Sequence, residues 1–408
     1  MTCGNNKKLS LYIHIPFCLS KCEYCDFFSI TPKAGIFNGY KSIPDSYVDA
    51  LCSEILYRVG KYCPNSLNSV YIGGGTPSLL DKNQLKKICD TIFLCKDVFC
   101  DDEPFEFTIE VNPDDVTKEL LESFEENGIN RISCGIQSCT DSCLQFVNRR
   151  AKRKENLKAM EIISRYWKGK KSFDLICGLP YESKESFKES LELLMSFNPD
   201  HISMYSLTIE DQTPLGRKCN SGQLDYDFNY ADELWLESKA FLEKNGYCQY
   251  EVSNFCKPDC ECIHNLVYWN HEDYLGCGSG ASGTLYDCDG RAFRWTNTTD
   301  IEKYIDFWCE DFASLYKKKD LNVCAREVVD CQTSIFEYFM MGLRKTAGIS
   351  EKDFFNKFKR TIPQQIIGLF EKWQKKGLAD IICQNDEKRY FLTKDGLLFL
   401  NRFLEEIN

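Results

Sequence analysis

Long apolar runs are absent from this sequence. No stretch approaches the roughly 18 consecutive apolar residues of a membrane-spanning helix, and the opening MTCGNNKKLS has neither an apolar signal core nor an Arg-rich presequence. We therefore expect a cytoplasmic protein without a transmembrane segment, for which peripheral membrane contact stays open. A basic patch is absent too: the net charge is −11, with Lys and Arg interspersed among acids, so no nucleic-acid partner is expected.

Histidine is scarce, with 4 residues in 408, whereas cysteine is abundant, with 24. A secreted disulfide framework disagrees with the chain length, with the lack of a signal peptide and with the many cysteines placed singly inside apolar runs. A free thiol in such a run behaves as a small buried hydrophobe. Two groups stand apart by their close spacing. They are Cys18, Cys22 and Cys25, and then Cys256, Cys260 and Cys262, which are followed by His264.

Short β-rich runs alternate with segments of helical period through the first half of the chain. The runs are LYIHIPF (11–17), SVYIGGGT (69–76), EFTIEVNP (106–113), RISCGIQS (131–138), SFDLICGLP (172–180) and HISMYSLTIE (201–210). This alternation predicts an α/β fold with a parallel sheet, either open and doubly wound or a complete or partial TIM-type barrel. Both place chemistry at the carboxyl ends of strands, where five of these runs carry polar, Gly-rich or cysteine residues. One shared site is predicted there.

The second half of the chain loses this rhythm. We expect a barrel over 1–215, a barrel extension over 216–325 that contains a long irregular segment rich in Cys, Asn and aromatic residues, and a C-terminal module over 326–408. Helices near 333–345, 350–358 and 363–376, followed by a hairpin-like pair and a closing helix, predict an α+β module like a winged helix. Its charge is too mixed to favour DNA.

The three thiols of CLSKCEYC need a site that uses three cysteines. Structural zinc takes four ligands, commonly as two separated pairs, so it fits this single compact loop less well. A tight loop of three can hold three corners of a [4Fe-4S] cube and leave the fourth iron without a protein ligand. An open metal position is where catalytic sites receive a small chelating molecule. The alternative to a cluster is that the three cysteines merely share a hydrophobic core or a zinc loop.

The pattern CxxxCxxC after a first strand, with Tyr24 before the last cysteine, resembles the signature of the radical S-adenosylmethionine (SAM) enzymes. The resemblance implies a [4Fe-4S] cluster held by Cys18, Cys22 and Cys25. It implies that the amino and carboxylate groups of SAM chelate the free iron, and that an electron from the cluster cleaves SAM to a 5′-deoxyadenosyl radical. The fold that it implies is a partial (β/α)6 barrel of TIM type.

The other strand ends suit SAM for reasons that residue chemistry supplies. Gly74, Gly75 and Thr76 place flexible backbone and its N–H groups beside a ligand, which fits the methionine end of SAM. Carboxylates such as Glu110 and Asp174 complement a cationic sulfonium and ammonium and can bind a ribose. Each is weak evidence alone, since a strand-end acid can equally cap a helix or form a salt bridge.

A narrower resemblance covers nearly the whole chain. The motifs YIHIPFCxxxCxYCDF, GGGTPS, IEVNP, GIQS, DLICGLP, YSLTIEDQTPL, HNLVYW and GLRKTAGIS look like those of oxygen-independent coproporphyrinogen III oxidases and their haem-chaperone branch, HemW. This resemblance implies SAM contacts at Tyr12, Tyr24, Gly74, Gly75, Thr76, Glu110, Gln137, Arg149 and Asp174. The histidine that follows the arginine in the family's RxH is Ala151 here.

Two features favour the chaperone branch over the decarboxylating oxidase. The oxidase carries a further cysteine two positions after the third, where this sequence has Phe27, and it has a longer segment ahead of the first strand. The resemblance therefore implies a haem chaperone that transfers haem to acceptor haemoproteins and uses an electron donor for its cluster. The alternative is a radical SAM enzyme that decarboxylates a porphyrinogen. Whether the chain acts as an enzyme by cleaving SAM is left open.

The run HNLVYWNH combines an axial-ligand type with aromatic enclosure, which haem needs. By resemblance His264, in HNxxYW, is the haem candidate, because Ser282 replaces a second family histidine. Alternatively His264 hydrogen-bonds within a folded loop, or it joins Cys256, Cys260 and Cys262 in a zinc or auxiliary cluster site. His14 is expected to donate a hydrogen bond beside the cluster and not to ligate it.

Overall fold

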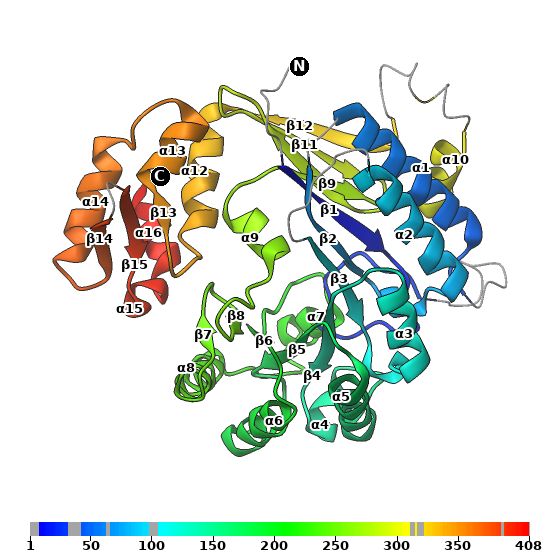
Figure 1. Ribbon diagram of the computed structural model, residues 1–408. Coiled ribbons are helices and arrows are strands. Elements are labelled where there is room, and N and C mark those ends of the chain that lie inside the picture. The colour runs from blue at the N-terminus through cyan, green and yellow to red at the C-terminus, as the bar shows by residue number, and fades with distance from the viewer. Residues whose placement is uncertain are drawn as a thin grey trace.

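The computed structural model describes residues 8–31, 42–62, 66–97, 105–310, 315, 322–384 and 387–407. Six parallel strands form the centre of its large sheet (Figure 1). They are β1 (Lys8–Ile15), β2 (Ser66–Gly74), β3 (Glu106–Val111), β4 (Arg131–Gln137), β5 (Lys170–Cys177) and β6 (His201–Ser206). The full order is β12-β11-β10-β9-β1-β2-β3-β4-β5-β6-β8-β7, an open sheet of 12 strands.

Helices connect successive parallel strands and cover the outer face of the curved sheet (Figure 1). They are α1 (Asp45–Tyr62), α2 (Lys82–Asp97), α3 (Lys118–Glu126), α4 (Asp141–Phe146), α5 (Arg153–Tyr166) and α6 (Lys184–Ser196). Two further helices, α7 (Pro214–Asn220) and α8 (Phe228–Lys244), follow β6. Short 3-10 turns follow β2 (Pro77–Leu79) and β3 (Pro113–Asp115). The predicted α/β fold is confirmed, as a partial (β/α)6 barrel.

Alternation along the strands separates the core from the concave face. Val70, Ile72, Phe107 and Ile109 are fully buried members of one large hydrophobic core. Their neighbours in β2 and β3, such as Tyr71 and Glu110, instead line a cavity on the concave face. Since successive side chains of a strand point to opposite faces, one face of this sheet supplies stability and the other supplies chemistry.

The segment after β6 extends the sheet at both edges. Its elements are β7 (Cys248–Gln249), β8 (Asn254–Cys256), α9 (Ile263–Trp269), β9 (Tyr274–Cys277), β10 (Ser282–Tyr286), β11 (Ala292–Asn297), α10 (Ile301–Trp308) and β12 (Cys324–Val329). β9 pairs parallel to β1, and β10 to β12 follow it as an antiparallel meander. The stretch predicted to be irregular therefore holds short ordered elements, because strand pairing to β1 and β6 compensates for its weak periodicity.

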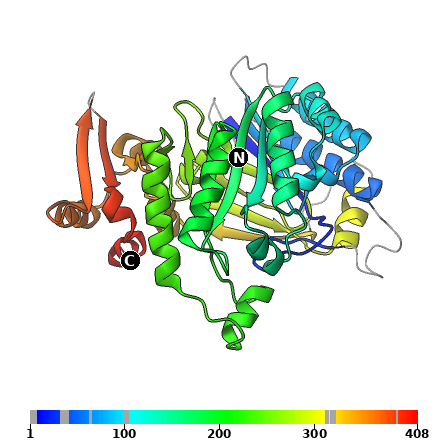
Figure 2. The same cartoon turned by 90° about the horizontal axis from the view of Figure 1, so that it is seen from below.

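The C-terminal module has a hydrophobic core of its own, with Phe339, Phe354, Phe370 and Tyr390 at its centre. It comprises α12 (Cys331–Gly342), β13 (Ile349–Ser350), α13 (Glu351–Phe358), α14 (Gln364–Gln374), β14 (Ala379–Gln384), β15 (Glu387–Leu392), α15 (Lys394–Leu397) and α16 (Leu400–Ile407). The order helix, strand, two helices and a hairpin is like that of a winged helix. The module lies beside α8 (Figure 2). Its Lys394 forms an ion pair with Glu243 of α8.

The proposed domain boundaries at 215 and 325 stay predictions. In the part of the chain that the structure describes, no helix is long and apolar enough to cross a membrane.

Candidate functional site

The loop after β1 carries the three closely spaced thiols and is tied back on itself. The N–H of Cys18 donates to the carbonyl of Ile30 (3.0 Å), and the N–H of Ile30 donates to the carbonyl of Pro16 (2.8 Å). His14 Nε2 lies 2.9 Å from the carbonyl oxygen of Phe28. The imidazole therefore hydrogen-bonds the loop beside the thiols and does not face a metal position, as predicted for it.

Two neighbouring elements hold the same loop from outside. The N–H of Glu23 donates to the carbonyl of Val147 (3.0 Å), and its own carbonyl accepts from the N–H of Leu215 (2.9 Å). The side-chain amide of Asn148 donates to the carbonyl of Lys21 (2.8 Å). Contacts from the C-terminal end of α4 and from α7 therefore hold the cysteine loop in place.

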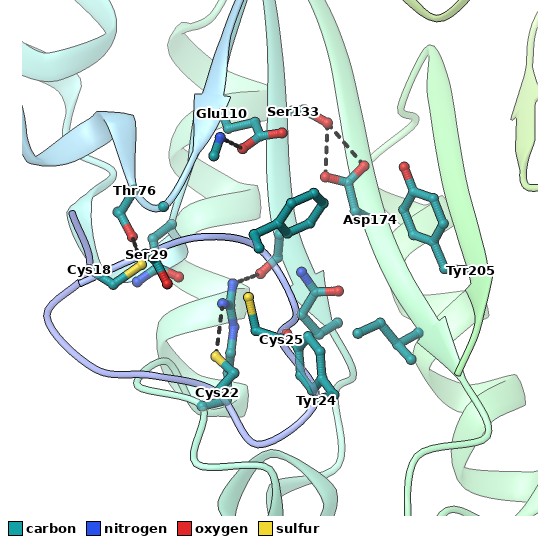
Figure 3. Close-up of a pocket in the computed structure, with 18 of the residues that line it drawn as sticks. Cys18, Cys22, Tyr24, Cys25, Ser29, Thr76, Glu110, Ser133, Asp174 and Tyr205 are labelled. Carbon is teal, nitrogen blue, oxygen red and sulfur yellow. Dashed lines mark hydrogen bonds between the residues drawn. The ribbon is translucent and has the colours of Figure 1, made fainter. Parts of the chain in front are cut away.

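A cavity of about 560 Å³ begins at this loop and runs along the concave face of β2 to β6 (Figure 3). Most of the predicted site residues line it. They are Cys18, Cys22, Tyr24, Cys25, Gly74, Gly75, Thr76, Glu110, Gln137, Arg149 and Asp174. Strand ends that are far apart in sequence therefore meet at a single site, as the strand pattern predicts.

Polar donors approach two of the thiols. Thr76 Oγ1 donates to Cys18 Sγ at 3.4 Å, and Arg149 Nη1 donates to Cys22 Sγ at 3.7 Å (Figure 3). Each contact places a hydrogen-bond donor beside a sulfur of the loop. Burial raises the pKa of Cys25, while the charge of Lys21 lowers it. All three thiols are partly exposed, so an incoming metal cluster can reach them.

The donor set fits a [4Fe-4S] cluster with one open iron better than it fits zinc. Among the described residues that line the cavity, the cysteines are Cys18, Cys22 and Cys25 alone. No three His, Cys, Asp or Glu side chains of the described residues come together around a single metal ion. A mononuclear zinc needs its sulfur ligands at about 2.3 Å, whereas a cube accepts thiolates at separate corners.

The glycines at the end of β2 allow this strand to pack against the cysteine loop. Gly74 has φ +107°, and a Cβ there would lie 2.4 Å from the ring of His14. A Cβ at Gly75 would lie 2.7 Å from the carbonyl oxygen of Phe17. Only glycine fits such close backbone approaches, and the N–H of Gly74 is engaged with Glu110 Oε2 (3.1 Å).

Two carboxylates lie in the middle of the cavity. The hydroxyl of Tyr71 donates to Glu110 Oε1 (2.9 Å), and burial raises the pKa of Glu110 to about 7. Ser133 Oγ lies 2.8 and 3.0 Å from the two oxygens of Asp174, and Ser172 donates to Asp174 at 3.1 Å. Burial raises the pKa of Asp174 as well. Because no cation of the described residues forms an ion pair with either group, a cationic ligand would stabilise both ionised forms.

Gln137 and Arg149 complete the wall beside the thiols. Gln137 has φ +66°, a left-handed conformation that is uncommon for a side chain of its kind. Such strained positions cluster at functional sites, and here the strain turns the end of β4 into the cavity. Arg149 Nη2 donates to the carbonyl of Gly135 (2.5 Å), which aims the guanidinium at Cys22. Ala151, where the family's RxH has its histidine, is buried.

The structure does not bring two predicted residues into the cavity lining. Tyr12 is half-buried, and its hydroxyl lies 2.8 Å from His14 Nδ1, so it supports the imidazole that holds the cysteine loop. His264 is 1% exposed, with Nδ1 2.9 Å from Ser69 Oγ and Nε2 2.9 Å from the hydroxyl of Tyr268. Their assignments to SAM and to haem stay predictions.

Two cysteines of the second group are buried, whereas Cys260 is partly exposed. Cys256 is buried in β8, and Cys262 is buried with its thiol donating to Glu106 Oε1 (3.4 Å). The described part of the chain contains no cluster of three metal-binding side chains there. The zinc or auxiliary cluster site that the spacing of these cysteines suggested stays a prediction.

Several cavity residues escaped the sequence analysis. The two-residue period of a strand could have found them, because residues two positions from a site residue lie on the same face of the sheet. Stepping back from Gln137 reaches Gly135, Ser133 and Arg131, and the same period in β6 joins Tyr205, Ser203 and His201. All of these line the cavity.

Comparison with known proteins agrees with this geometry. The family model of the radical SAM superfamily matches residues 12–194. "Heme chaperone HemW" of Bacillus subtilis (strain 168) is 33% identical over 396 residues, which cover 96% of this chain and 97% of that protein. "Heme chaperone HemW" of Escherichia coli (strain K12) is 32% identical over 404 residues, 97% of each chain.

A solved structure shares the fold. Coproporphyrinogen III oxidase (HemN) from Escherichia coli, a radical SAM enzyme, superposes with a TM-score of 0.76 at 21% identity, over 98% of this chain and 90% of that one. The chain thus has the architecture of a radical SAM enzyme, and its sequence is similar from end to end to the two chaperones. It belongs to the radical SAM superfamily and, within it, to the family of the HemW heme chaperones.

Proposed function

We propose that the chain binds haem and transfers it to acceptor haemoproteins, and that it carries a single SAM-ligated [4Fe-4S] cluster. Membership of the superfamily implies a [4Fe-4S] cluster and SAM as cofactors. The observation that carries haem transfer is the full-length similarity to proteins named heme chaperones, at 33% and 32% identity. The proposal places the protein in the cytoplasm, with an electron donor for the cluster as a further partner.

The cavity supports a division of labour between its residues. Cys18, Cys22 and Cys25 would hold the cluster, which when bound supplies an electron to SAM. Glu110 and Asp174 would attract the sulfonium and ammonium charges of SAM, since both are half-buried carboxylates that form no ion pair with the described residues. The backbone beside Gly74 and Gly75 leaves room for the methionine end, because neither residue has a side chain to fill it.

Phe27 favours the chaperone over porphyrinogen decarboxylation. It lies two positions after Cys25, where the decarboxylating oxidase has a further cysteine, and it lines the cavity while 67% exposed. A large apolar ring at the mouth of the cavity offers contact to a flat hydrophobic ligand but no thiol for chemistry. For the alternative function, oxidative decarboxylation of a porphyrinogen, this chain therefore lacks the further cysteine that the oxidase carries.

His264 remains the proposed axial ligand, and its hydrogen bonds indicate which nitrogen would bind iron. Ser69 donates to Ser10 (2.9 Å), so it accepts from Nδ1 of His264, and Nε2 accepts from the hydroxyl of Tyr268. Burial lowers the pKa of His264 to about 3, which keeps the ring neutral, the form that ligates metal. Haem iron would replace the Tyr268 hydroxyl at Nε2.

Haem titration of three variants tests this ligand. His264→Ala should lose the absorbance of the bound, ligated haem, whereas Tyr268→Phe should keep or strengthen binding, because it frees Nε2. His271→Ala is the matched control, since His271 is also buried, at 2% exposed, and lies outside the cavity lining. Equal loss in the His264 and His271 variants, or loss in Tyr268→Phe alone, would contradict the assignment.

The function itself is tested by two anaerobic assays on the reconstituted protein. Haem-loaded protein mixed with an apo-haemoprotein should convert the acceptor to its holo form. Incubation with coproporphyrinogen III, SAM and reductant should leave the substrate mass unchanged. A mass loss equal to carbon dioxide, without haem transfer, would instead establish the decarboxylase.

A further inference from the structure

Arg131 lies at the closed end of the cavity, where β4 begins. Its side chain is 2% exposed, and Nε and Nη2 have no hydrogen-bond partner among the described residues. It lines the cavity together with Tyr71, Ser203 and Asn265. Nε and Nη2 form one edge of the guanidinium, and this edge binds both oxygens of a carboxylate in bidentate pairs. The edge of the Arg131 guanidinium that could bind a carboxylate therefore has no partner among the described residues.

The nearby acid Glu106 does not occupy this edge. Its Oε1 accepts from the N–H of His264 (3.0 Å) and the thiol of Cys262 (3.4 Å), and its Oε2 accepts from the N–H of Ile263 (3.0 Å). Glu106 thereby caps the first turn of α9, where a carboxylate is favourable. It balances part of the charge of Arg131 but forms no hydrogen bond with it.

A second unpaired group lies next to Arg131. Thr108 is its partner across the β3 to β4 ladder, and Thr108 Oγ1 is buried without a hydrogen-bond partner among the described residues. Paired residues of adjacent parallel strands project from the same face of the sheet. Buried polar groups without partners are rare and costly, and a charged one most of all, so two adjacent ones indicate a missing ligand or water.

The position of Arg131 relative to the carboxylates gives the cavity two electrostatic levels. In the β3 to β4 register Glu110 pairs with Ser133, and Thr108 pairs with Arg131. The acidic level, Glu110 and Asp174, thus lies nearer the thiols and suits the cationic part of SAM. The guanidinium lies one inward-facing position deeper, which suits an anion on a second molecule below SAM.

We propose that Arg131, assisted by Thr108, forms a carboxylate-binding site at the floor of the cavity, for a ligand that lies below SAM. Two sources share this chemistry: a small free carboxylic acid, and a propionate side chain of a tetrapyrrole. The site itself stands without the proposed function, whereas the tetrapyrrole source rests on it.

The first experiment tests the site alone. Reconstituted protein with SAM is melted anaerobically in propionate and in propionamide, which has the same shape without the charge. Propionate should raise the melting temperature more, and Arg131→Lys, which keeps the charge but loses the fork, should abolish the difference. Arg294→Gln, outside the cavity, should retain it. If the wild-type protein has the same melting temperature in both solutes, water fills the site and the proposal is overturned. This outcome holds even if Arg131→Lys fails to fold.

The second experiment identifies the source. Wild-type protein is titrated with haem and with haem dimethyl ester, in which both propionates are blocked. A tetrapyrrole propionate at Arg131 should make the ester bind roughly tenfold to a hundredfold more weakly, and Arg131→Gln should reduce this ratio to about one. Equal binding of both by the wild-type protein excludes the tetrapyrrole source and supports a small free acid if propionate stabilises. Absence of all haem binding refutes the proposed function, while the propionate test still decides the site.

Discussion

The two groups of closely spaced cysteines end in opposite environments. Cys18, Cys22 and Cys25 follow a parallel strand, line the cavity and are partly exposed. The second group has nearly the same spacing, but Cys256 and Cys262 are 1% and 0% exposed, and Cys260 is partly exposed. The difference teaches that similar spacing does not give the same environment. The first group projects from the carboxyl end of a barrel strand, whereas Cys256 lies in β8, between β6 and β7, and Cys262 directly precedes α9, where packing buries both thiols.

The largest expected effect comes from removing one thiol of the first group. Cys22→Ser should abolish the brown [4Fe-4S] absorbance after anaerobic reconstitution, because two cysteines cannot hold three corners of the cube. Haem titration should remain largely intact, since the proposed haem ligand lies on α9. Iron and sulfide are quantified per chain, with circular dichroism to confirm folding. Loss of haem binding in a folded variant would show that the two cofactors share one site.

A second substitution tests how closely the cysteine loop is fitted. Gly74→Ala would place a Cβ 2.4 Å from the ring of His14, at φ +107°. The ring cannot give way, because Tyr12 and Phe28 hold both of its nitrogens. We expect the free energy of unfolding in urea to fall by about 2 to 5 kcal/mol, from backbone strain and overpacking together.

Gly246→Ala is the matched control for this substitution. Gly246 also has a left-handed backbone, φ +86°, but a Cβ there would meet nothing within 4 Å. It should cost only the strain, about 1 to 2 kcal/mol. Equal losses in the two alanine variants would show that the contact with His14 carries no energy, and the cysteine loop would then be less tightly constrained than the structure indicates.

The sequence predicted the cavity better than it predicted the α9 segment, for a physical reason. Strand periodicity and the topology of parallel sheets place strand ends together whatever the detailed packing, so Glu110, Gln137 and Asp174 could be assigned to one site. His264 depends on which way a seven-residue helix faces, which the contacts of α9 with Glu106 and Ser69 decide. No local pattern carries that information. Strand alternation places Arg131 on the same face as Gln137. Nothing in the sequence, however, marks a buried arginine as unpaired.

A smaller effect should appear as a pH dependence of SAM affinity. Burial raises the pKa of Glu110 to about 7, so the carboxyl is protonated in the folded protein at pH 6 and ionised at pH 8. A cationic ligand prefers the ionised form, so SAM should bind more tightly as the pH rises through 7, by roughly tenfold between 6 and 8. The raised pKa of Glu110 has the opposite effect on the folding stability of the ligand-free protein. Since the pKa in the folded state lies above the ordinary value of 4.5, the ligand-free protein loses stability as the pH rises from about 4.5 to 7.

Glu110→Gln isolates this group from all others that titrate. Anaerobic equilibrium binding of SAM to the glutamine variant should be weaker at pH 8 and should lack the part of the pH dependence that Glu110 contributes. The remaining slope then belongs to SAM and to other residues. A wild-type slope that persists unchanged in the variant would mean that Glu110 does not meet the cationic part of SAM.

The smallest effect is expected in the second cysteine group. Cys262→Ser replaces a buried thiol by a hydroxyl of similar shape that can donate to Glu106 Oε1, the present partner at 3.4 Å. The stronger donor offsets the greater cost of burying a hydroxyl, so the free energy of unfolding should change by less than about 1 kcal/mol. Iron and sulfide per chain should equal those of the wild-type protein. Should the iron content fall while the variant stays folded, the packed cysteines near α9 would have to be a metal site after all, and burial would no longer distinguish the two groups.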